Sequence, residues 1–270
     1  MQITYRRIPG GSAGLCTGWE NRHPAVHFRA AVVADLHDAP YKKIIDALRR
    51  VEPDLILVPG DLTEDLTEDS SDCDMPGRPG LGFLSEAAAI APTFYAWGNH
   101  ETGAGHVNLN NSARDRTVPP SVCAHWLESI RKSGAVLLDQ SYVSRNGLVL
   151  GGLRSGLLNE DRVPDIGWLD DFCRAPGYRI LLCHHPEYYD RYLRDYPIDL
   201  FVSGHAHGGQ WRLFGRGIFA PDQGLFPKYT DGIHEGRLVI SRGLSNTVAP
   251  IPRLFNPREL VVVEVRQPPV

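Results

Sequence analysis

Short apolar runs alternate with amphipathic segments along the chain. The runs at 26–35 (VHFRAAVVAD) and 54–61 (DLILVPGD) have the length and the continuous apolar character of buried strands. The segment between them, 41–52 (YKKIIDALRRVE), places its apolar residues at helical spacing, which predicts a helix with one apolar face. Strands that alternate with helices are typical of the α/β class.

The same alternation continues towards the C-terminus. Polar, turn-rich stretches at 62–80 and 101–120 predict two long loops. The last third of the chain reads mostly as strand and loop. Further helices are predicted at 81–91, 121–134 and 165–175, and further strands at 93–100, 135–139, 147–153, 178–185, 198–205, 237–242 and 259–265.

The composition is that of an ordinary globular protein. Of the 270 residues, 42% are hydrophobic and 22% are charged, so a sizeable core can form. No linker rich in Pro, Gly or Ser divides the chain, and we expect one domain over 1–270. Residues 1–27 precede the motifs described below, and we regard them as an N-terminal extension of unclear role.

Charge argues against a nucleic-acid partner. The formal net charge is −4, and the sequence contains no block of Lys and Arg. A surface that binds duplex nucleic acid usually carries clustered cations. We therefore do not expect nucleic acid as a partner.

The N-terminus and the cysteines favour a cytoplasmic location. The first 20 residues lack the apolar run of a secretory signal, and no stretch of 18 apolar residues exists to span a membrane. The cysteines are odd in number, scattered and without a C-x-x-C pair, so we expect reduced thiols. They are Cys16, Cys73, Cys123, Cys173 and Cys183.

Candidate chemistry appears where the apolar runs end. Five runs each end on side chains that can bind a metal ion, and in α/β sheets ligands bind outside the carboxyl ends of the strands. Imidazole nitrogens and carboxylate oxygens suit Mn, Fe, Zn and Ni. The residues, in chain order, are Asp35 and His37, Asp61, Asn99 and His100, His184, and His205 and His207.

Each of these pieces has an ordinary alternative interpretation when taken alone. An Asp-x-His after a strand is more often a cap or a turn, and Gly-Asp is as often a plain turn. The pair His205 and His207 in a glycine-rich turn is more informative, because two neighbouring imidazoles rarely satisfy each other. All five pieces together, in this order and at these strand ends, favour a metal site.

The motifs DLH (35–37), GDL (60–62), GNHE (98–101), LLCHHP (181–186) and GHAHGGQ (204–210) resemble those of the calcineurin-like metallophosphoesterase family. The chain is most similar to the bacterial branch of small phosphoesterases with a GHTHGGQ-type motif. The resemblance covers about residues 28–265 and implies a four-layer α-β-β-α sandwich of two mixed sheets.

The resemblance also implies a centre of two divalent metal ions, Mn being favoured over Fe, Zn or Ni. A bridging ligand would connect the two ions, and each ion would have three further ligands. His100 would act near the leaving group, as a general acid or as a donor to the phosphate. The implied ligands are Asp35, His37 and His207 for the first ion, Asn99, His184 and His205 for the second, and Asp61 as the bridge.

The function that follows from the resemblance is hydrolysis of a phosphate ester by a hydroxide that bridges the metals. A diester substrate is favoured, and a phosphomonoesterase is the alternative. A second alternative is hydrolysis of a lipid-linked pyrophosphate or phosphoester at the cytoplasmic face of the membrane. A third is a non-catalytic binding module that has kept the fold. The sequence indicates neither the natural substrate nor the oligomeric state.

Three further residues are weaker candidates. Glu64, three residues after Asp61, is expected to orient His100, although a solvated loop residue is as good an interpretation. Arg154 is a candidate for binding a second phosphate or a carboxylate of the substrate, and the alternative is a surface arginine. His185 is expected to line the pocket or to face solvent.

Overall fold

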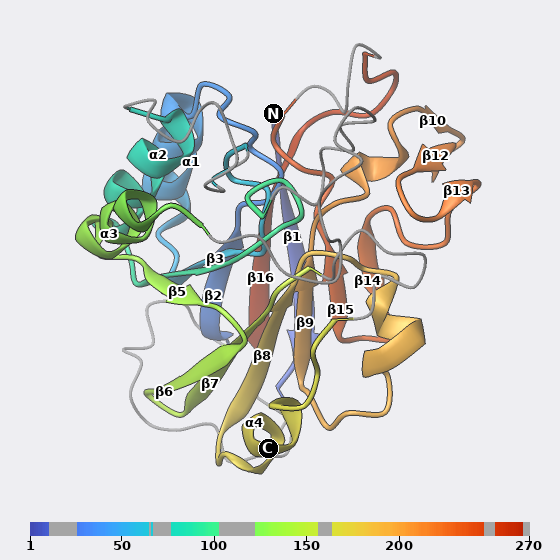
Figure 1. The fold of residues 1–270 in the computed structure, drawn as a ribbon. Coiled ribbons are helices and arrows are strands. Elements are labelled where there is room, and N and C mark those ends of the chain that lie inside the picture. The colour runs from blue at the N-terminus through green and yellow to red at the C-terminus, as the bar shows by residue number, and fades with distance from the viewer. Residues whose placement is uncertain are drawn as a thin grey trace, which may run out of the picture.

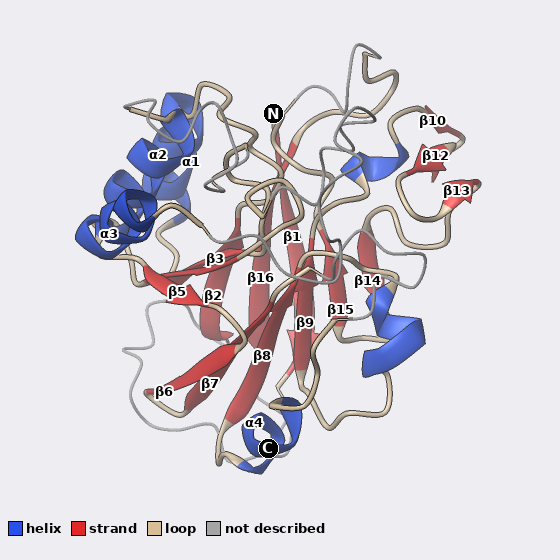
Figure 2. Cartoon of the chain, in the orientation of Figure 1, coloured by secondary structure: helices blue, strands red, loops and turns tan. Residues whose placement is uncertain are grey.

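The computed structural model describes residues 1–10, 26–64, 66, 77–102, 122–155, 164–245 and 252–266. Two six-stranded sheets form the body of the protein, and helices lie outside them (Figures 1 and 2). Two small two-stranded sheets, β10–β11 and β12–β13, are additional to this body.

The first sheet has the strand order β1-β16-β2-β3-β4-β5. The strands β2, β3, β4 and β5 run parallel to one another, whereas β16 is antiparallel to β2 and parallel to β1. The sheet is therefore mixed. Its strands are β1 (Gln2–Pro9), β2 (Val26–Val32), β3 (Leu55–Val58), β4 (Thr93–Ala96), β5 (Val136–Leu138) and β16 (Glu259–Arg266).

The second sheet has the order β14-β15-β9-β8-β7-β6 and is also mixed. Its centre, β15-β9-β8-β7, is parallel, and each edge strand is antiparallel to its neighbour. Its strands are β6 (Ser141–Arg145), β7 (Leu148–Leu153), β8 (Tyr178–Cys183), β9 (Leu200–Ser203), β14 (Gly232–His234) and β15 (Leu238–Ile240).

The main core lies between the two sheets. Because side chains alternate along a strand, Leu55 and Leu57 of β3 point into this core, where Ile180 and Leu182 of β8 meet them from the second sheet. The intervening Ile56 belongs to a separate core on the outer face of the first sheet. The two sheets thus share one core.

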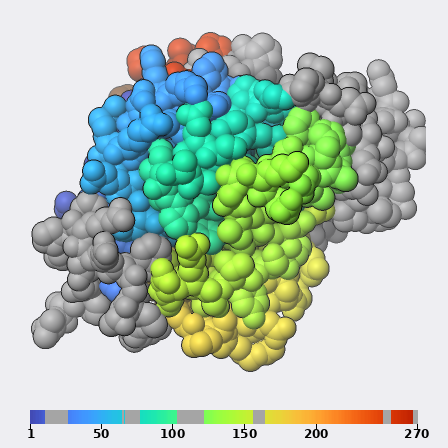
Figure 3. Space-filling model, turned by 90° about the vertical axis from the view of Figure 1, so that its left-hand side faces the viewer, coloured from blue at the N-terminus to red at the C-terminus, as the bar shows by residue number. Residues whose placement is uncertain are grey.

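Helices cover the outer faces. On the first sheet they are α1 (Lys42–Val51), α2 (Pro79–Ala88) and α3 (Ala124–Ser133), which lie side by side on one face of the molecule (Figure 3). On the second sheet, α4 (Leu169–Arg174) and the π-helical turn η1 (Tyr189–Leu193) bury their apolar side chains. The layers are thus helix, sheet, sheet and helix, and the predicted four-layer α/β sandwich is confirmed.

The sequence pattern missed some elements of this fold. Residues Gln2–Pro9 lie in the stretch left without a role, and they form β1 along the whole length of β16. The short strands between 212 and 234 were also missed. They are β10 (Arg212–Leu213), β11 (Arg216–Gly217), β12 (Phe219–Ala220) and β13 (Gly224–Leu225), followed by β14.

The expectation of reduced thiols is wrong at one position. Cys173 and Cys183 are free, but Cys123 is disulfide-bonded. Spacing along the sequence did not reveal this bond, because a disulfide depends on which cysteines the fold brings together.

Among the described residues, no helix combines the length and the apolarity that crossing a bilayer requires.

Candidate metal centre

The candidate ligands lie in the turns that follow β2, β3, β4, β8 and β9. Within each sheet these strands are parallel neighbours, so their carboxyl ends meet at one edge. The backbone in these turns is unusual, because five of the ligand candidates have left-handed φ angles between 45° and 65°. They are Asp35, His37, Asp61, His205 and His207.

A left-handed backbone costs a non-glycine residue on the order of 1–3 kcal/mol, and such strain collects at functional sites. Close glycines make this arrangement possible. A Cβ atom at Gly98 would overlap the carboxylate of Asp61, and one at Gly204 would lie 2.7 Å from Oδ2 of Asp35. Glycine at these two positions therefore lets the two carboxylates approach the backbone of a neighbouring strand end.

The first group of donor atoms comes from Asp35, His37 and His207, whose candidate ligand atoms all lie within 4.8 Å of one another. Nε2 of His37 lies 3.2 Å from Nε2 of His207, and the latter lies 3.6 Å from Oδ1 of Asp35. The side chains of Asp35 and His207 are buried. Two imidazole nitrogens and a carboxylate thus converge on one point.

The second group comes from Asp61, His184 and His205, again within 4.8 Å. Nδ1 of His184 lies 3.0 Å from the carbonyl oxygen of Pro59, which can only accept a hydrogen bond. Nδ1 therefore carries a proton, and Nε2, which faces Oδ2 of Asp61 at 3.0 Å, is the nitrogen that would bind a metal ion.

Asp61 belongs to the second group and also adjoins the first. Its Oδ2 is 3.6 Å from Nε2 of His37 in the first group and 3.0 Å from Nε2 of His184 in the second. Its other oxygen, Oδ1, accepts a hydrogen bond from the backbone N–H of His100. One carboxylate thus adjoins both groups of donors.

Two buried oxygens suit a cation. Oδ2 of Asp35 and Oδ1 of Asn99 are buried and have no hydrogen-bond partner among the described residues. Buried acceptors in this state are rare in proteins, because burial without a partner carries a desolvation cost. A metal ion would satisfy both oxygens, and the imidazole and carboxylate donors fit a divalent transition metal.

Electrostatics act differently on the donors. The carboxylate of Asp61 outweighs burial and raises the pKa of His184 to about 9, so a bound metal ion would have to displace a proton there. Burial, together with the nearby His37, lowers the pKa of His207 well below its ordinary value, so this imidazole is neutral. Burial alone would raise the pKa of Asp61, but His184 and His100 outweigh it and hold that pKa well below the usual range. Metal ligation needs neutral imidazoles and ionised carboxylates.

Glu64 connects two histidines of the site. Its Oε2 lies 2.6 Å from Nδ1 of His100, and its Oε1 lies 3.1 Å from Nδ1 of His37. The rings of the two histidines are nearly perpendicular, with centroids 4.5 Å apart. Glu64 is therefore in contact with the site. The orientation of His100 by Glu64 stays a prediction.

Glu101 was not among the residues singled out from the sequence. It is fully buried, and it accepts hydrogen bonds from the backbone N–H groups of Asp61 (3.0 Å), Leu62 (2.6 Å) and Gly98 (2.9 Å), and from the hydroxyl of Tyr95 (2.7 Å). This carboxylate fixes the turns after β3 and β4 to each other. The GNHE motif contains the residue, but its partners come from the tertiary fold.

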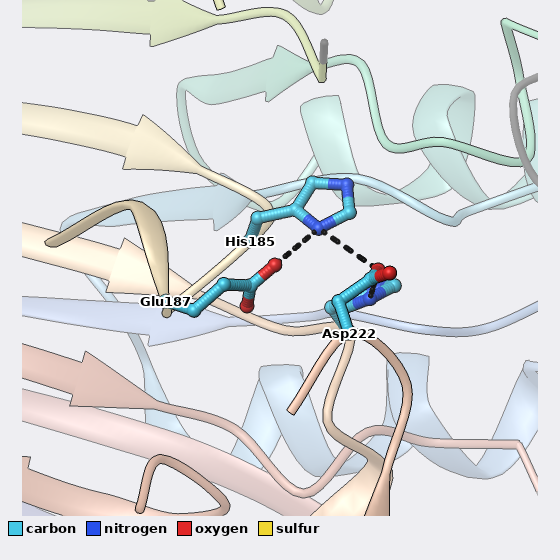
Figure 4. A group of neighbouring side chains, drawn as sticks. His185, Glu187 and Asp222 are labelled. Carbon is cyan, nitrogen blue, oxygen red and sulfur yellow. Dashed lines mark hydrogen bonds and ion pairs between the residues drawn. The ribbon is translucent and has the colours of Figure 1, made fainter. Parts of the chain in front are cut away.

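A second carboxylate network surrounds His185 (Figure 4). Its Nδ1 lies 2.9 Å from Oε1 of Glu187 and 3.7 Å from Oδ2 of Asp222, and the same oxygen of Asp222 lies 2.8 Å from Nε2 of His205. His185 is only 1% exposed, so it does not face solvent. Sequence reasoning missed Glu187 and Asp222, since a single acidic residue in a loop carries no signal.

Arg154 follows β7, and its side chain is bound by Asp139. Its Nε donates a hydrogen bond of 2.8 Å to Asp139, its Nη2 forms an ion pair with the same carboxylate, and its backbone N–H donates to Gln140. The contacts that the described residues provide do not bring Arg154 into either group of donors. Binding a substrate would require it to compete with Asp139.

Arg253 is a cation that the sequence did not single out. Its Nη2 lies 3.1 Å from Nδ1 of His207, whereas its Nε and Nη1 are buried without a hydrogen-bond partner in the described structure. Burial lowers the pKa of Arg253 to about 10, so it remains charged at neutral pH. Asn256, three residues later, donates to the carbonyl oxygen of His207 at 2.7 Å.

The family model described as "Calcineurin-like phosphoesterase" matches residues 28–209, which include all of the candidate ligands. The chain belongs to the calcineurin-like phosphoesterase family. Family membership confirms the resemblance to the calcineurin-like metallophosphoesterases, whereas the bacterial branch with a GHTHGGQ-type motif stays a prediction. It also accounts for histidines and carboxylates at the ends of parallel strands.

Curated relatives agree with the family. The chain is 24% identical over 252 residues to a metallophosphoesterase of Caenorhabditis elegans, an alignment that covers 88% of the chain and 48% of the relative. It is 27% identical to the metallophosphoesterase Cj0846 of Campylobacter jejuni, covering 86% and 56%. It is 26% identical to the phosphodiesterase YaeI of Escherichia coli, covering 70% and 64%. The chain thus spans about half to two thirds of the length of these relatives.

Proposed function

We propose that this protein hydrolyses a phosphodiester with two divalent metal ions, of which Mn is the favoured metal. The observation that carries the proposal is the pair of donor groups, Asp35–His37–His207 and Asp61–His184–His205, each within 4.8 Å. Two adjacent groups of this kind suit two ions, because the Asp61 carboxylate adjoins donors of both groups and two-metal hydrolases hold their ions about 3.5–4 Å apart.

In this proposal Asp61 would hold both ions, and Asn99, whose Oδ1 is buried without a partner, would add a ligand to the second one. Two divalent ions bound there would lower the pKa of a shared water so that hydroxide is available at neutral pH, and would neutralise phosphate oxygens. The donors include only two carboxylates, Asp35 and Asp61, so the loaded site keeps a positive charge that attracts phosphate.

His100 is placed to protonate the leaving group. Its Nδ1 is bound to Glu64, which leaves Nε2 to donate a proton to an oxygen of the substrate. Its backbone N–H is fixed to Asp61, so the ring keeps its place relative to the donors. Glu64 thus acts as a positioning residue, and His100 is the proposed general acid.

Arg253 is the proposed contact for a non-bridging phosphate oxygen. Its two unpartnered nitrogens lie beside His207, and a guanidinium binds phosphate with two parallel hydrogen bonds. Arg154 remains a weaker candidate for the same task, because Asp139 already binds it.

The alternatives differ in substrate and in catalysis. YaeI, which is 26% identical to this chain, is named a phosphodiesterase. This name favours a diester over a monoester as the substrate class. A binding module without catalysis is disfavoured, because the two donor groups keep the imidazole and carboxylate side chains that metal ions bind. A cytoplasmic location stays a prediction, and the disulfide at Cys123 is a reason to test it, since such bonds are rare in that compartment.

The test compares hydrolysis of bis-p-nitrophenyl phosphate and p-nitrophenyl phosphate by metal-stripped protein, before and after addition of Mn²⁺. We expect a Mn²⁺-dependent rate with the diester that exceeds the rate with the monoester. His100→Ala should lower the diester rate about 10²–10⁴-fold, as removal of a general acid does. A preference for the monoester would replace the diester proposal, and an absence of any rate with Mn, Fe, Zn or Ni would contradict catalysis.

A further inference from the structure

Large apolar side chains are exposed on one part of the molecule. Of the 12 large hydrophobic residues that are exposed in the described structure, eight lie within 211–226 and 254–255. We call these eight the apolar rim. They are Trp211, Leu213, Phe214, Phe219, Leu225, Phe226, Leu254 and Phe255.

The two segments of the apolar rim lie next to each other. Trp211 forms a β-bridge with Leu254, and the backbone N–H of Arg212 donates to the carbonyl oxygen of Leu254. Phe219 is paired with Leu225 across β12 and β13. Figure 1 shows β10, β12 and β13 gathered at one corner of the molecule. The eight side chains therefore belong to one surface.

Three phenylalanines of the apolar rim are unfavourable in two ways: their side chains are exposed to solvent, and their backbone is left-handed. Phe214, Phe226 and Phe255 are 96%, 75% and 85% exposed, and their φ angles are 49°, 52° and 53°. Glycine or asparagine is the usual residue at a left-handed position, whereas a bulky side chain is an outlier there. Neither packing nor backbone preference favours phenylalanine at these three turns, and an external contact would account for it.

The surface that carries the apolar rim is locally basic. Residues 211–228 and 252–258 contain five Lys and Arg residues and one Asp. Arg212 is buried and Arg253 lies largely buried beside His207, so Arg216, Lys228 and Arg258 are the cations at the surface. Arg212 and Lys228 form ion pairs with Asp231 and Asp190. Arg216 is exposed, and the described residues offer no ion-pair partner to it or to Arg258. A basic surface with projecting aromatic side chains complements anionic lipid headgroups above an apolar layer.

The apolar rim is joined to the metal centre. Asn256 bonds the carbonyl oxygens of His207 and Gln210, and Arg253 contacts His207. A bilayer in contact with the rim would therefore lie beside the turn that provides two of the candidate ligands. A second copy of the chain fits this surface less well, because symmetric pairing would bring two basic surfaces together.

We propose that the apolar rim binds the surface of an anionic phospholipid bilayer, with Phe214, Phe226 and Phe255 inserted between the headgroups. The proposal does not depend on the diesterase activity, since binding needs no turnover. It places the metal centre where a phosphoester carried by a lipid can reach it.

The test is co-sedimentation of the whole 270-residue chain with vesicles of phosphatidylcholine, with and without phosphatidylglycerol. We expect the protein to bind the vesicles that contain phosphatidylglycerol more tightly than those of phosphatidylcholine alone. The triple change Phe214→Gly, Phe226→Gly and Phe255→Gly removes the side chains and also relieves the left-handed strain. It should bind about tenfold or more weakly while its melting temperature stays the same or rises.

The matched control replaces exposed apolar residues elsewhere, Tyr5→Ser with Leu127→Ser, and should bind the anionic vesicles like the wild type. No binding by the wild type, equal binding by the triple variant, or equal binding to neutral vesicles would overturn the proposal. Sedimentation velocity of the wild type and the triple variant tests whether a second copy of the chain covers the rim instead. A dimer formed by the wild type but not by the triple variant would assign the rim to a second copy and overturn the membrane proposal. Hydrolysis of bis-p-nitrophenyl phosphate by the triple variant is measured alongside vesicle binding. Because the three phenylalanines lie outside the candidate metal centre, a retained rate would show that any loss of vesicle binding is independent of catalysis.

Discussion

At the scale of residues, carboxylates that do not themselves belong to the two donor groups hold the histidines of the site. Glu64 contacts His37 and His100, and Asp222 contacts His205. Such outer carboxylates fix the orientation of an imidazole and increase its basicity, and their loss typically costs a factor of about 10–100 in metal affinity or activity. Each contact gives a prediction for a single substitution.

Glu64→Gln should lower kcat about 10–100-fold, because the amide keeps the shape of the side chain but no longer stabilises a protonated His100. The measurement is the rate with bis-p-nitrophenyl phosphate at saturating Mn²⁺, together with the metal content. Glu86→Gln, a change at a glutamate on α2 away from the donors, is the control and should be silent. Equal kcat for Glu64→Gln and wild type would remove Glu64 from the account.

Asp222→Asn should weaken Mn²⁺ binding about 10–100-fold, because the carboxylate 2.8 Å from Nε2 of His205 is lost. Calorimetric titration of the metal-free protein measures this directly and does not depend on turnover. Asp170→Asn, at an exposed acidic residue of α4, provides the comparison. If the Asp222 variant keeps the affinity of the wild type, the carboxylate has no role in holding His205.

Arg253→Ala should raise KM more than it lowers kcat, because the proposed contact to a phosphate oxygen forms already in the bound substrate. A tenfold rise in KM corresponds to about 1.4 kcal/mol of lost binding energy. Arg216→Ala, an exposed arginine on the same surface, controls for a general loss of positive charge. An unchanged KM for Arg253→Ala would remove it from the substrate site.

At the scale of elements, the ends of the strands are where the sequence alone predicted the candidate site. The runs that become β2, β3, β4, β8 and β9 were recognised because they are apolar and end on potential ligands, and their order made the family resemblance visible. Strands and helices generally end earlier than the apolar pattern suggests, since the last residues of each run already form the turn.

The missed elements lack such a pattern. The strands β10, β11, β12 and β13 have two residues each, too few to show a period, and they lie among glycines. In β1, the polar and charged residues suit an edge strand of a sheet rather than a buried one, so the segment did not look like a strand. Glu101, Glu187, Asp222 and Arg253 act through partners distant in the sequence, and no local signal marks them.

The turn after β4 gives a prediction at this scale. Gly98→Ala should destabilise the protein by about 1–3 kcal/mol, because the added Cβ overlaps the carboxylate of Asp61. Denaturant unfolding of the metal-free protein measures the change. Gly167→Ala, where the new Cβ would come no closer than 3.4 Å to Asp165, is the control. A Gly98→Ala variant as stable as the wild type would show that the two strand ends are not held as closely as described.

At the scale of the whole molecule, two parallel sheet centres packed face to face bring donors from both sheets to a single edge. Asp35 and Asp61 come from the first sheet, and His184, His205 and His207 come from the second. The metal centre thus depends on the packing of the sheets, and a bound ion should in turn stabilise the folded chain, because the unfolded chain has no such site.

The measurement that tests the central claim most directly is the electron paramagnetic resonance spectrum of the Mn²⁺-loaded protein, taken together with the number of ions bound per chain. The account predicts two ions per chain and a spectrum broadened by exchange between neighbouring ions, since two-metal hydrolases hold their ions about 3.5–4 Å apart. Asp61→Asn should lose the exchange-coupled signal. A single bound ion with the spectrum of isolated Mn²⁺, or no bound ion, would contradict the dinuclear centre.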